Sequence, residues 1–171
     1  DTGDDIVIGD NGSASFDITS GESVITQIGT SVSASPNPDA NGEGAKDYIG
    51  AGNGSDIVFG GLGADDVHAG SDTSRDILVG DLGGATFTGG VLTTIATSLH
   101  QFGGSDMLLG GDGDDVIFGG KGTDYIGTNR SEQPIGNESG NDVIIGDNGT
   151  ATFIAVAGQS TEQSISTISS A

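Results

Sequence analysis

The chain lacks most of the residues from which other kinds of protein site are built. Its 171 residues include no cysteine and no tryptophan, only four lysines and arginines, and two histidines. Without cysteine, neither disulfide bonds nor thiolate metal sites can form. His68 and His100 are accompanied by no nucleophile elbow, zinc-binding helix or pair of glutamates. We therefore expect no catalytic centre and no enzyme activity.

Positive charge is almost absent, and the negative charge is carried by one residue type. The net charge is −21, with 20 Asp against 5 Glu. Such a charge repels nucleic acid, and no run of about 20 apolar residues is present to enter a membrane. A general solvating charge would not favour the shorter acid. We expect this bias where carboxylates are held in tight loops and neutralised by bound cations.

A nine-residue unit accounts for this composition. It reads Gly-Gly-x-Gly-x-Asp followed by three residues with an aliphatic at the centre, as in GGLGADDVH (60–68), GGDGDDVIF (110–118) and GGKGTDYIG (119–127). Glycine at places one, two and four permits positive φ and a tight bend with bare carbonyls. Carbonyl and carboxylate oxygens suit a hard cation with about six to eight oxygen ligands, which favours Ca²⁺ over Zn²⁺. A disordered acidic tail, the main alternative, has no reason to keep this register.

The candidate calcium ligands follow from their places in the unit. The carboxylates at the sixth place are those of Asp5, Asp47, Asp56, Asp65, Asp76, Asp106, Asp115, Asp124 and Asp142. Further oxygens are expected from the first and third places of the full loops, at Gly60, Leu62, Gly110, Asp112, Gly119 and Lys121. Spacings of 18 or 20 residues predict an ion beside each of four pairs: Asp47 with Asp65, Asp56 with Asp76, Asp106 with Asp124, and Asp124 with Asp142.

The repeated motifs resemble the haemolysin-type calcium-binding repeats of RTX proteins over residues 44–85 and 103–151. The resemblance implies several Ca²⁺ ions between successive turns of a parallel β-roll, in a protein that is extracellular or on the surface of a bacterium. The fold we expect is all-β: a parallel β-roll solenoid of nonapeptide repeats with inserted β-hairpins.

A longer repeat is superimposed on the short one. DIVIGDNGSASF (5–16), DILVGDLGGATF (76–87) and DVIIGDNGTATF (142–153) begin 71 and 66 residues apart. They predict two modules, 1–75 and 76–141, and the start of a third at 142–171. In these copies Asp stands at the second place and Ala at the sixth, so the loop either ends a roll or binds an ion with incomplete coordination. The additional candidate ligands are Asp10, Asp81 and Asp147.

Alternating, β-branched segments follow each of these loops. Residues 15–28, 86–99 and 152–168 read as hairpins, with turns at Gly21 and Glu22, at Gly89 and Gly90, and around Gly158. In the nonapeptides the eighth residue should point inward, yet many residues at places seven and nine are also apolar. Such a surface needs a cover. The hairpins fold over it, a neighbouring copy docks on it, or it stays exposed.

Two functions remain open. The chain is a calcium-binding structural module of a long repetitive extracellular protein, such as an adhesin stalk, surface layer or filament, whose partners are copies of itself or adjacent modules. Alternatively, it is the calcium-triggered secretion and folding segment of a secreted toxin, protease or lipase. Hairpin-decorated repeats of about 70 residues favour the first.

Overall fold

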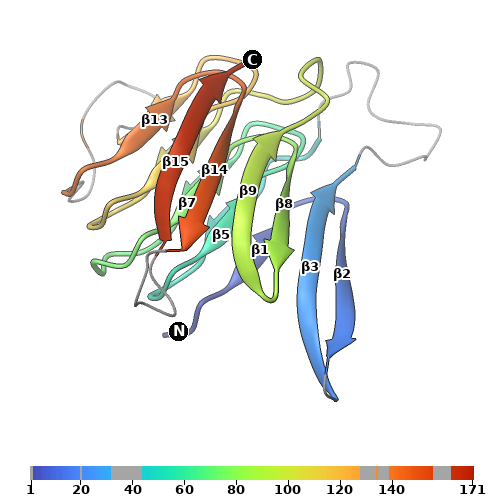
Figure 1. Cartoon of the computed structure of the whole chain (residues 1–171). Helices are drawn as coiled ribbons and strands as arrows, with labels where there is room; N and C mark the ends of the chain where they lie inside the picture. Colours follow the sequence, from blue (N-terminus) through green and yellow to red (C-terminus); the bar gives the residue numbers. More distant parts are fainter. Residues whose placement is uncertain (1, 20, 32–43, 128–133, 135–138, 156–162) are drawn as a thin grey trace.

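The computed structural model describes residues 2–19, 21–31, 44–127, 134, 139–155 and 163–171, and this part of the chain is all-β (Figure 1). No helix occurs in it, and hence none that could cross a membrane. The strands are β1 (Ile6–Ile8), β2 (Gly12–Thr19), β3 (Glu22–Thr30), β4 (Tyr48–Gly50), β5 (Ile57–Phe59), β6 (Asp66–His68), β7 (Ile77–Val79), β8 (Gly83–Thr88), β9 (Val91–Thr97), β10 (Met107–Leu109), β11 (Val116–Phe118), β12 (Tyr125–Ile126), β13 (Val143–Ile145), β14 (Gly149–Ala155) and β15 (Gln163–Ser170).

The short strands of the nonapeptides form two parallel sheets. One has five strands in the order β1-β5-β7-β11-β13, and the other has four in the order β12-β10-β6-β4. Consecutive nonapeptides enter opposite sheets, because each unit offers only two or three strand residues before its glycine-rich bend reverses the chain. Each loop therefore lies beside loops that are distant in sequence.

The middle residue of each short strand points between these two sheets. The buried cluster there contains Ala51, Val58, Val67, Ala69, Leu78, Leu108 and Ile117, with Val7, Ile49 and Ile126 packed against it. Eight of the nine residues expected to point inward belong to this cluster. Ile144 is the exception and is 53% exposed, because β13 is the outermost strand of its sheet.

Three hairpins form a third, antiparallel sheet in the order β15-β14-β9-β8-β3-β2. Positive φ angles at Gly21 (87°), Gly89 (60°) and Gly90 (81°) allow the first two turns, which lie where the sequence predicts. The third turn falls outside the described residues. Each hairpin ladder has a register shift beside its phenylalanine, Phe16, Phe87 or Phe153.

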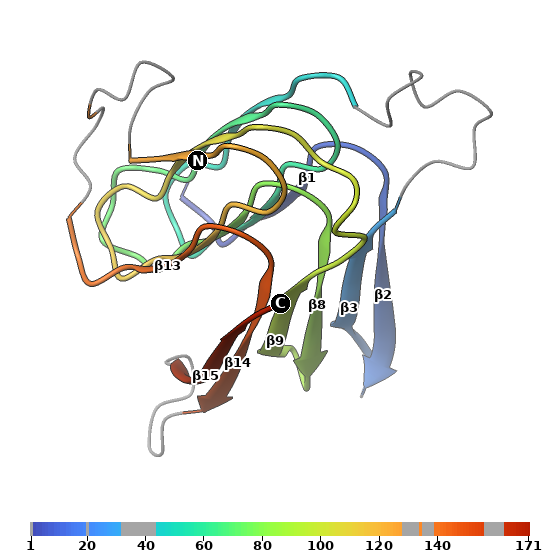
Figure 2. The same ribbon diagram turned by 90° about the horizontal axis from the view of Figure 1, so that it is seen from above.

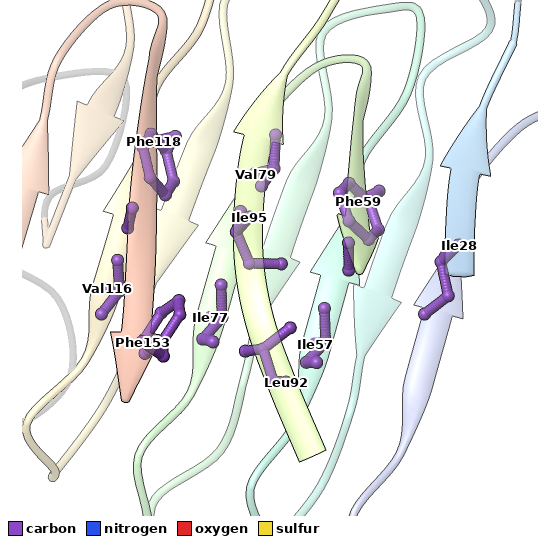
Figure 3. Close-up of a cluster of buried hydrophobic side chains, with 12 residues drawn as sticks. Ile28, Ile57, Phe59, Ile77, Val79, Leu92, Ile95, Val116, Phe118 and Phe153 are labelled. Atoms are coloured by element: carbon purple, nitrogen blue, oxygen red, sulfur yellow. The ribbon is translucent and has the colours of Figure 1, made fainter. Parts of the chain in front are cut away.

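The hairpin sheet covers the outer face of the five-stranded sheet. All three hairpins lie on the same side of the parallel strands (Figure 2), and the residues at places seven and nine of β5, β7 and β11 interleave with hairpin side chains (Figure 3). Phe59 and Phe118 are 0% exposed. Burial of one such side chain stabilises the fold by about 1.5–3 kcal/mol. Of the three alternatives for this face, cover by the hairpins is confirmed. The four-stranded sheet has no such cover at Tyr48, which is 77% exposed.

A threonine at the end of the first hairpin and another at the end of the second bond each of these hairpins to the next one. The Thr30 hydroxyl accepts the Gly83 N–H at 2.7 Å and donates to the Gly83 carbonyl at 3.0 Å. Thr97 makes the same two contacts with Gly149, at 2.9 and 3.3 Å. The hairpin sheet is thus continuous across the boundary of the longer repeat.

The three sheets grow at the same rate along the chain. The first repeat contributes β1 and β5 to the five-stranded sheet, β4 and β6 to the four-stranded sheet, and β2 and β3 to the hairpin sheet. The second contributes β7 and β11, β10 and β12, and β8 and β9 to the same three sheets. Because each layer gains two strands per repeat, the layers stay in step.

Candidate metal centres

The nine carboxylates predicted at the sixth place fall into two rows, one at the start of each parallel sheet. The first carboxylate row precedes the strands of the five-stranded sheet, and the second precedes those of the four-stranded sheet. The first row is Asp5, Asp56, Asp76, Asp115 and Asp142; the second is Asp47, Asp65, Asp106 and Asp124. Residues inside the rows are buried: Asp56, Asp65, Asp106 and Asp115 are 0% exposed, and Asp76 is 2% exposed.

Beyond the first aspartate of each row, Oδ1 of each carboxylate accepts a backbone N–H of the neighbouring loop. In the first row the N–H of Asp56 donates to Asp76 Oδ1 at 2.9 Å, and that of Asp76 donates to Asp115 Oδ1 at 2.8 Å. In the second row the same bond joins Asp47 to Asp65 Oδ1, Asp65 to Asp106 Oδ1, and Asp106 to Asp124 Oδ1, at 2.8 to 3.0 Å.

The other carboxylate oxygen is where a cation fits. The Oδ2 atoms of Asp47, Asp56, Asp106 and Asp115 are buried, and none of them has a hydrogen-bond partner among the described residues. A buried carboxylate oxygen without a donor is strongly unfavourable unless a positive charge compensates it. These orphaned oxygens are the observation that points to bound metal.

Glycine at the first place opens the space in front of Oδ2. A Cβ on Gly119 would lie 2.5 Å from Asp124 Oδ2, and one on Gly60 would lie 2.9 Å from Asp65 Oδ2. Each would also collide with the carbonyl oxygen of the first-place glycine in the next loop, Gly146 or Gly80. Carboxylate and carbonyl oxygens therefore converge on a space that any side chain would fill.

The expectation that all three loop glycines take positive φ is wrong for the first place. Gly61 and Gly120 at the second place have φ of 106° and 98°, and Gly63 and Gly122 at the fourth have 125° and 136°. Gly60 and Gly119 are not in this region. The second and fourth places need glycine for the bend, whereas the first needs it because oxygens approach closely.

Electrostatics in the metal-free rows oppose ionisation. Burial, reinforced by neighbouring carboxylates, raises the pKa of Asp106 to about 8 and those of Asp65 and Asp76 to about 7. Burial and the Asp142 charge raise the pKa of Asp115 to about 6. A divalent cation between the loops would reverse this, because it stabilises the ionised form.

The chemistry of the donor set suits a hard cation. No group of three or more His, Asp or Glu side chains converges within the described ranges, so carboxylates alone do not make a cage. Backbone carbonyls must supply the remaining ligands. All-oxygen, carbonyl-rich and irregular coordination is typical of Ca²⁺, whereas Zn²⁺ prefers nitrogen and sulfur, and Mg²⁺ a strict octahedron.

Three of the four predicted ion-flanking pairs are neighbours in the rows, and the fourth is wrong. Asp142 lies in the first row, where its Oδ1 accepts the Asp115 N–H at 3.1 Å, and it does not lie beside Asp124. In the described part of the interval between these two aspartates there is one short strand, β12, where two nonapeptides would give two. The adjacent pairs Asp65 with Asp106 and Asp76 with Asp115 bridge intervals too long to be recognised by spacing.

The loops with Asp at the second place are continued on the far side of their hairpins. Ala14, Ala85 and Ala151, assigned to the sixth place, lie within hairpin strands β2, β8 and β14, so that assignment is wrong. The sixth-place carboxylates are Asp47 and Asp106: a Cβ on Gly9 would lie 2.7 Å from Asp47 Oδ2, and one on Gly80 would collide with Asp106 Oδ2. We call these two the split loops, 9–11 with 44–47 and 80–82 with 103–106.

The second-place aspartates of the split loops contact backbone amides. Asp10 Oδ2 accepts the Leu62 N–H at 2.5 Å. Asp81, 2% exposed, accepts the Gly104 N–H at 2.9 Å through Oδ1 and the Lys121 N–H through Oδ2. Burial raises the pKa of Asp81 to about 7. Asp147, in the third copy, is exposed and accepts the Gly120 N–H through its backbone carbonyl.

The remaining candidates are placed by their own loops. The Asp112 carboxylate accepts the Ser139 hydroxyl at 2.6 Å. Lys121 is exposed, and its ammonium donates to the Gly103 carbonyl at 3.3 Å. A Cβ on Gly110 would collide with Asp115 Oδ2. Gly110 therefore has the same position relative to Asp115 as Gly119 has relative to Asp124.

A set of contacts at the fifth place was missed from the sequence. Asp4 Oδ1 accepts the Ser55 N–H, and Asp114 Oδ1 accepts the Asn141 N–H, both at 2.9 Å. Ser105 Oγ accepts the Thr123 N–H at 2.9 Å. Each bond joins fifth places of adjacent loops. The signal available was the predominance of Asp, Ser and Asn at a place treated as variable.

Comparison with known proteins agrees with this geometry. A model of the RTX calcium-binding nonapeptide repeat matches four copies in residues 41–90, 100–130 and 138–153, more than half of the chain. Neither the curated proteins nor the solved structures include a significant match. The matched ranges contain eight of the nine row aspartates, and they break where the hairpin of residues 83–97 and the connection after β12 interrupt the repeat. The chain therefore belongs to the family of RTX calcium-binding nonapeptide repeats.

Proposed function

We propose that the chain is a calcium-binding structural segment of a long repetitive extracellular protein, such as an adhesin stalk, a surface layer or a filament. Calcium binding follows from the family, and such repeats occur in secreted bacterial proteins. In this proposal the two parallel sheets are the walls of a β-roll, and Ca²⁺ ions lie between successive turns along both carboxylate rows. The modules are 1–75, 76–141 and the start of a third at 142–171. The role requires no catalysis.

The observation that supports this role is the equal growth of the three sheets. A decoration that added more or fewer strands than the sheet beneath it would lose contact after a few repeats. Here each repeat adds two strands to every layer, so further modules continue the structure without strain.

The end strands fit an array of this kind. Phe16 is 55% exposed and Ile18 82% exposed on β2, and Ile144 is 53% exposed on β13. The residue equivalent to Phe16 in the third hairpin, Phe153, is only 5% exposed because parallel strands lie against it. Unpaired strand edges and uncovered apolar side chains favour docking of further strands. Adjacent modules or copies of the chain are the proposed partners.

The test is to lengthen the array by one module. A second copy of residues 76–141 is inserted between residues 141 and 142, and the particle is measured in about millimolar calcium by small-angle scattering and cryo-electron microscopy. Two added strands per sheet at a spacing of about 4.8 Å should lengthen it by about 10 Å. A Gly/Ser-rich insert of equal length is the control and should add no strand signal by circular dichroism. An inserted module that misfolds, or that leaves the length unchanged, refutes the array.

A calcium-triggered secretion and folding segment is the second candidate. The observation that favours it is the set of buried carboxylates with raised pKa, which destabilise the fold when calcium is scarce. Three hairpins interrupting the nonapeptides count against it, because a secretion segment needs only an uninterrupted run. Under this alternative an inserted module brings no regular growth of the particle.

A further inference from the structure

The two split loops pose a structural problem that contiguous loops do not. In a contiguous loop such as 60–65, the first-place glycine and the sixth-place aspartate are joined by four residues of tight bend. In a split loop a whole hairpin intervenes between them. The halves must nevertheless return to the same relative position, because the Oδ2 atoms of Asp47 and Asp106 face the first-place glycines as in the contiguous loops.

The chain leaves the loop at the second place, and the residue there explains how. Second-place glycines of contiguous loops have positive φ, as Gly61 (106°), Gly111 (95°) and Gly120 (98°) show. Asp10 and Asp81 do not, since Leu99 is the one non-glycine residue with positive φ in the described part of the chain. An ordinary φ lets the backbone run on into the hairpin, and it also permits a side chain.

That side chain points back into the loops. Asp81 accepts the N–H of Gly104, on the returning half of its own loop, and the N–H of Lys121, at the third place of the next loop. Its carbonyl accepts the N–H of Gly61 in the preceding loop at 3.3 Å. One residue thus joins three successive loops and both halves of the split one.

The first split loop repeats one of these contacts, the one to the following loop. Asp10 Oδ2 accepts the N–H of Leu62, which also occupies the third place of the following loop. Glycine at the second place of that following loop makes room: a Cβ on Gly61 would lie 2.8 Å from Asp10 Oδ2, and one on Gly120 would collide with Asp81. The bond from the third-place N–H of the following loop to Oδ2 of the second-place aspartate thus occurs in both split loops, which indicates that it is a regular feature of the repeat.

We propose that Asp10 and Asp81 are positioning residues of the split loops, so that Asp47 and Asp106 meet their cations with the geometry of a contiguous loop: Asp81 joins the two halves of its loop, and Asp10 fixes the outgoing half of its loop to the following one. Asp81 accepts backbone amides through both carboxylate oxygens and Asp10 accepts one through Oδ2, whereas Oδ2 of Asp47 and of Asp106 has no donor among the described residues. This division separates the residues that orient a site from those that bind the ion. The inference rests on the proposed calcium role of the two rows.

The experiment compares Asp81→Ala, Asp81→Asn and Asp10→Ala with Asp17→Ala, an exposed hairpin aspartate. Calcium is titrated into the full chain by calorimetry, and backbone exchange is followed by hydrogen–deuterium exchange. Loss of an orienting partner typically weakens metal binding about 10–100-fold. We expect that loss for part of the bound calcium in Asp81→Ala, with the number of ions at saturation unchanged and faster exchange at Gly104 and Lys121. Asp81→Asn keeps one acceptor and should fall in between.

The outcomes separate the possible roles. Fewer ions at saturation in Asp81→Ala would make this residue a direct ligand and overturn the proposal, as would affinity and exchange equal to those of Asp17→Ala. If Asp81→Ala does not fold in calcium, the half-buried Asp10 decides, and unchanged binding in Asp10→Ala refutes the inference. Absence of calcium binding by the unmodified chain would instead refute the proposed function.

Discussion

Replacing Asp106 by asparagine should change stability in opposite directions with and without calcium. Asp106 is fully buried; its Oδ1 accepts the Asp65 N–H at 2.8 Å, and its Oδ2 has no donor among the described residues. Asparagine keeps the first contact and removes the charge. The variant therefore loses a cation ligand but also loses a buried carboxylate that repels its neighbours.

The stability that Asp106→Asn gains without calcium and the stability that it loses with calcium are of similar size, and both are large enough to measure. Burial raises the pKa of Asp106 from 3.8 to about 8, and each pKa unit of difference between the folded and unfolded states corresponds to about 1.4 kcal/mol. At pH 7 this carboxyl therefore destabilises the metal-free fold by on the order of 4 kcal/mol. An ion at about 100 times its dissociation constant stabilises the fold by about 2.7 kcal/mol, and the variant should lose roughly that amount in calcium.

The sign of the pH dependence follows from the raised pKa. Between pH 4 and 8 the folded state binds more protons at Asp106 than the unfolded state does, so metal-free stability falls as pH rises through this window. In Asp106→Asn this fall should be shallower. Below about pH 4 the carboxyl is protonated in both states, and the difference in slope disappears.

The assay is urea unfolding followed by circular dichroism, with chelator from pH 5 to 8 and with about millimolar calcium at pH 7. Asp17→Asn, in the exposed face of the first hairpin, is the matched control. We expect Asp106→Asn to be more stable than the unmodified chain in chelator and less stable in calcium. A variant destabilised under both conditions, or indistinguishable from Asp17→Asn, would show that Asp106 is not an uncompensated charge awaiting a cation.

Three substitutions test the hydrophobic core, the space that the first-place glycine leaves in front of Oδ2, and the threonine contact between hairpins. A change of pH tests whether protons compete with calcium. Phe118→Ala, at a side chain that is 0% exposed, should cost about 3–5 kcal/mol of stability while calorimetry counts the same number of calcium ions. Gly119→Ala places a Cβ 2.5 Å from Asp124 Oδ2 and should weaken calcium binding. Gly29→Ala, whose Cβ would meet nothing within 4 Å, should not. Equal calcium affinities of the two variants would show that the space in front of Oδ2 does not hold the ion. Thr97→Val removes the hydroxyl that accepts the Gly149 N–H and should cost about 1–3 kcal/mol in thermal unfolding, and no loss would mean that the hairpins are joined by their ladders alone. Calcium affinity should fall as pH drops from 8 to 5, because the pKa of Asp65 and of Asp76 is about 7 and protons compete for their oxygens; calorimetry at both pH values checks this.

Periodicity in the sequence predicted the features that depend on a single segment. The inward aliphatics and the hairpin turns at Gly21 and Gly89 follow from short periods in the sequence. Spacing also gives three of the four predicted aspartate pairs correctly: Asp47 with Asp65, Asp56 with Asp76, and Asp106 with Asp124. Spacing misplaces Asp142 because the interval before it has the length of two nonapeptides but lacks glycine at their first and second places.

The features that depend on two distant segments could not be read from one stretch of chain. Asp106 completes a loop that begins before the hairpin because the β8–β9 ladder returns the chain to its starting point. There the Ser98 N–H donates to the Leu82 carbonyl at 2.8 Å. The sequence pattern also leaves open which parallel sheet the hairpins cover. A usable signal existed: places seven and nine are both apolar in β5, β7 and β11, whereas β6 has Asp66 and His68 there.

The equal growth of the three sheets has a mechanical consequence. Each repeat of about 70 residues advances the structure by only two strand spacings, about 10 Å, whereas the same chain pulled straight would reach roughly 230 Å. In the proposed array, each module would therefore span a short distance for its chain length and hold a large reserve of extensible length. Under load, each module that released its calcium and unravelled would lengthen the molecule by about twenty times the rise it had contributed, and the others would remain folded. Once the load is removed, renewed calcium binding would refold the module and shorten the molecule again.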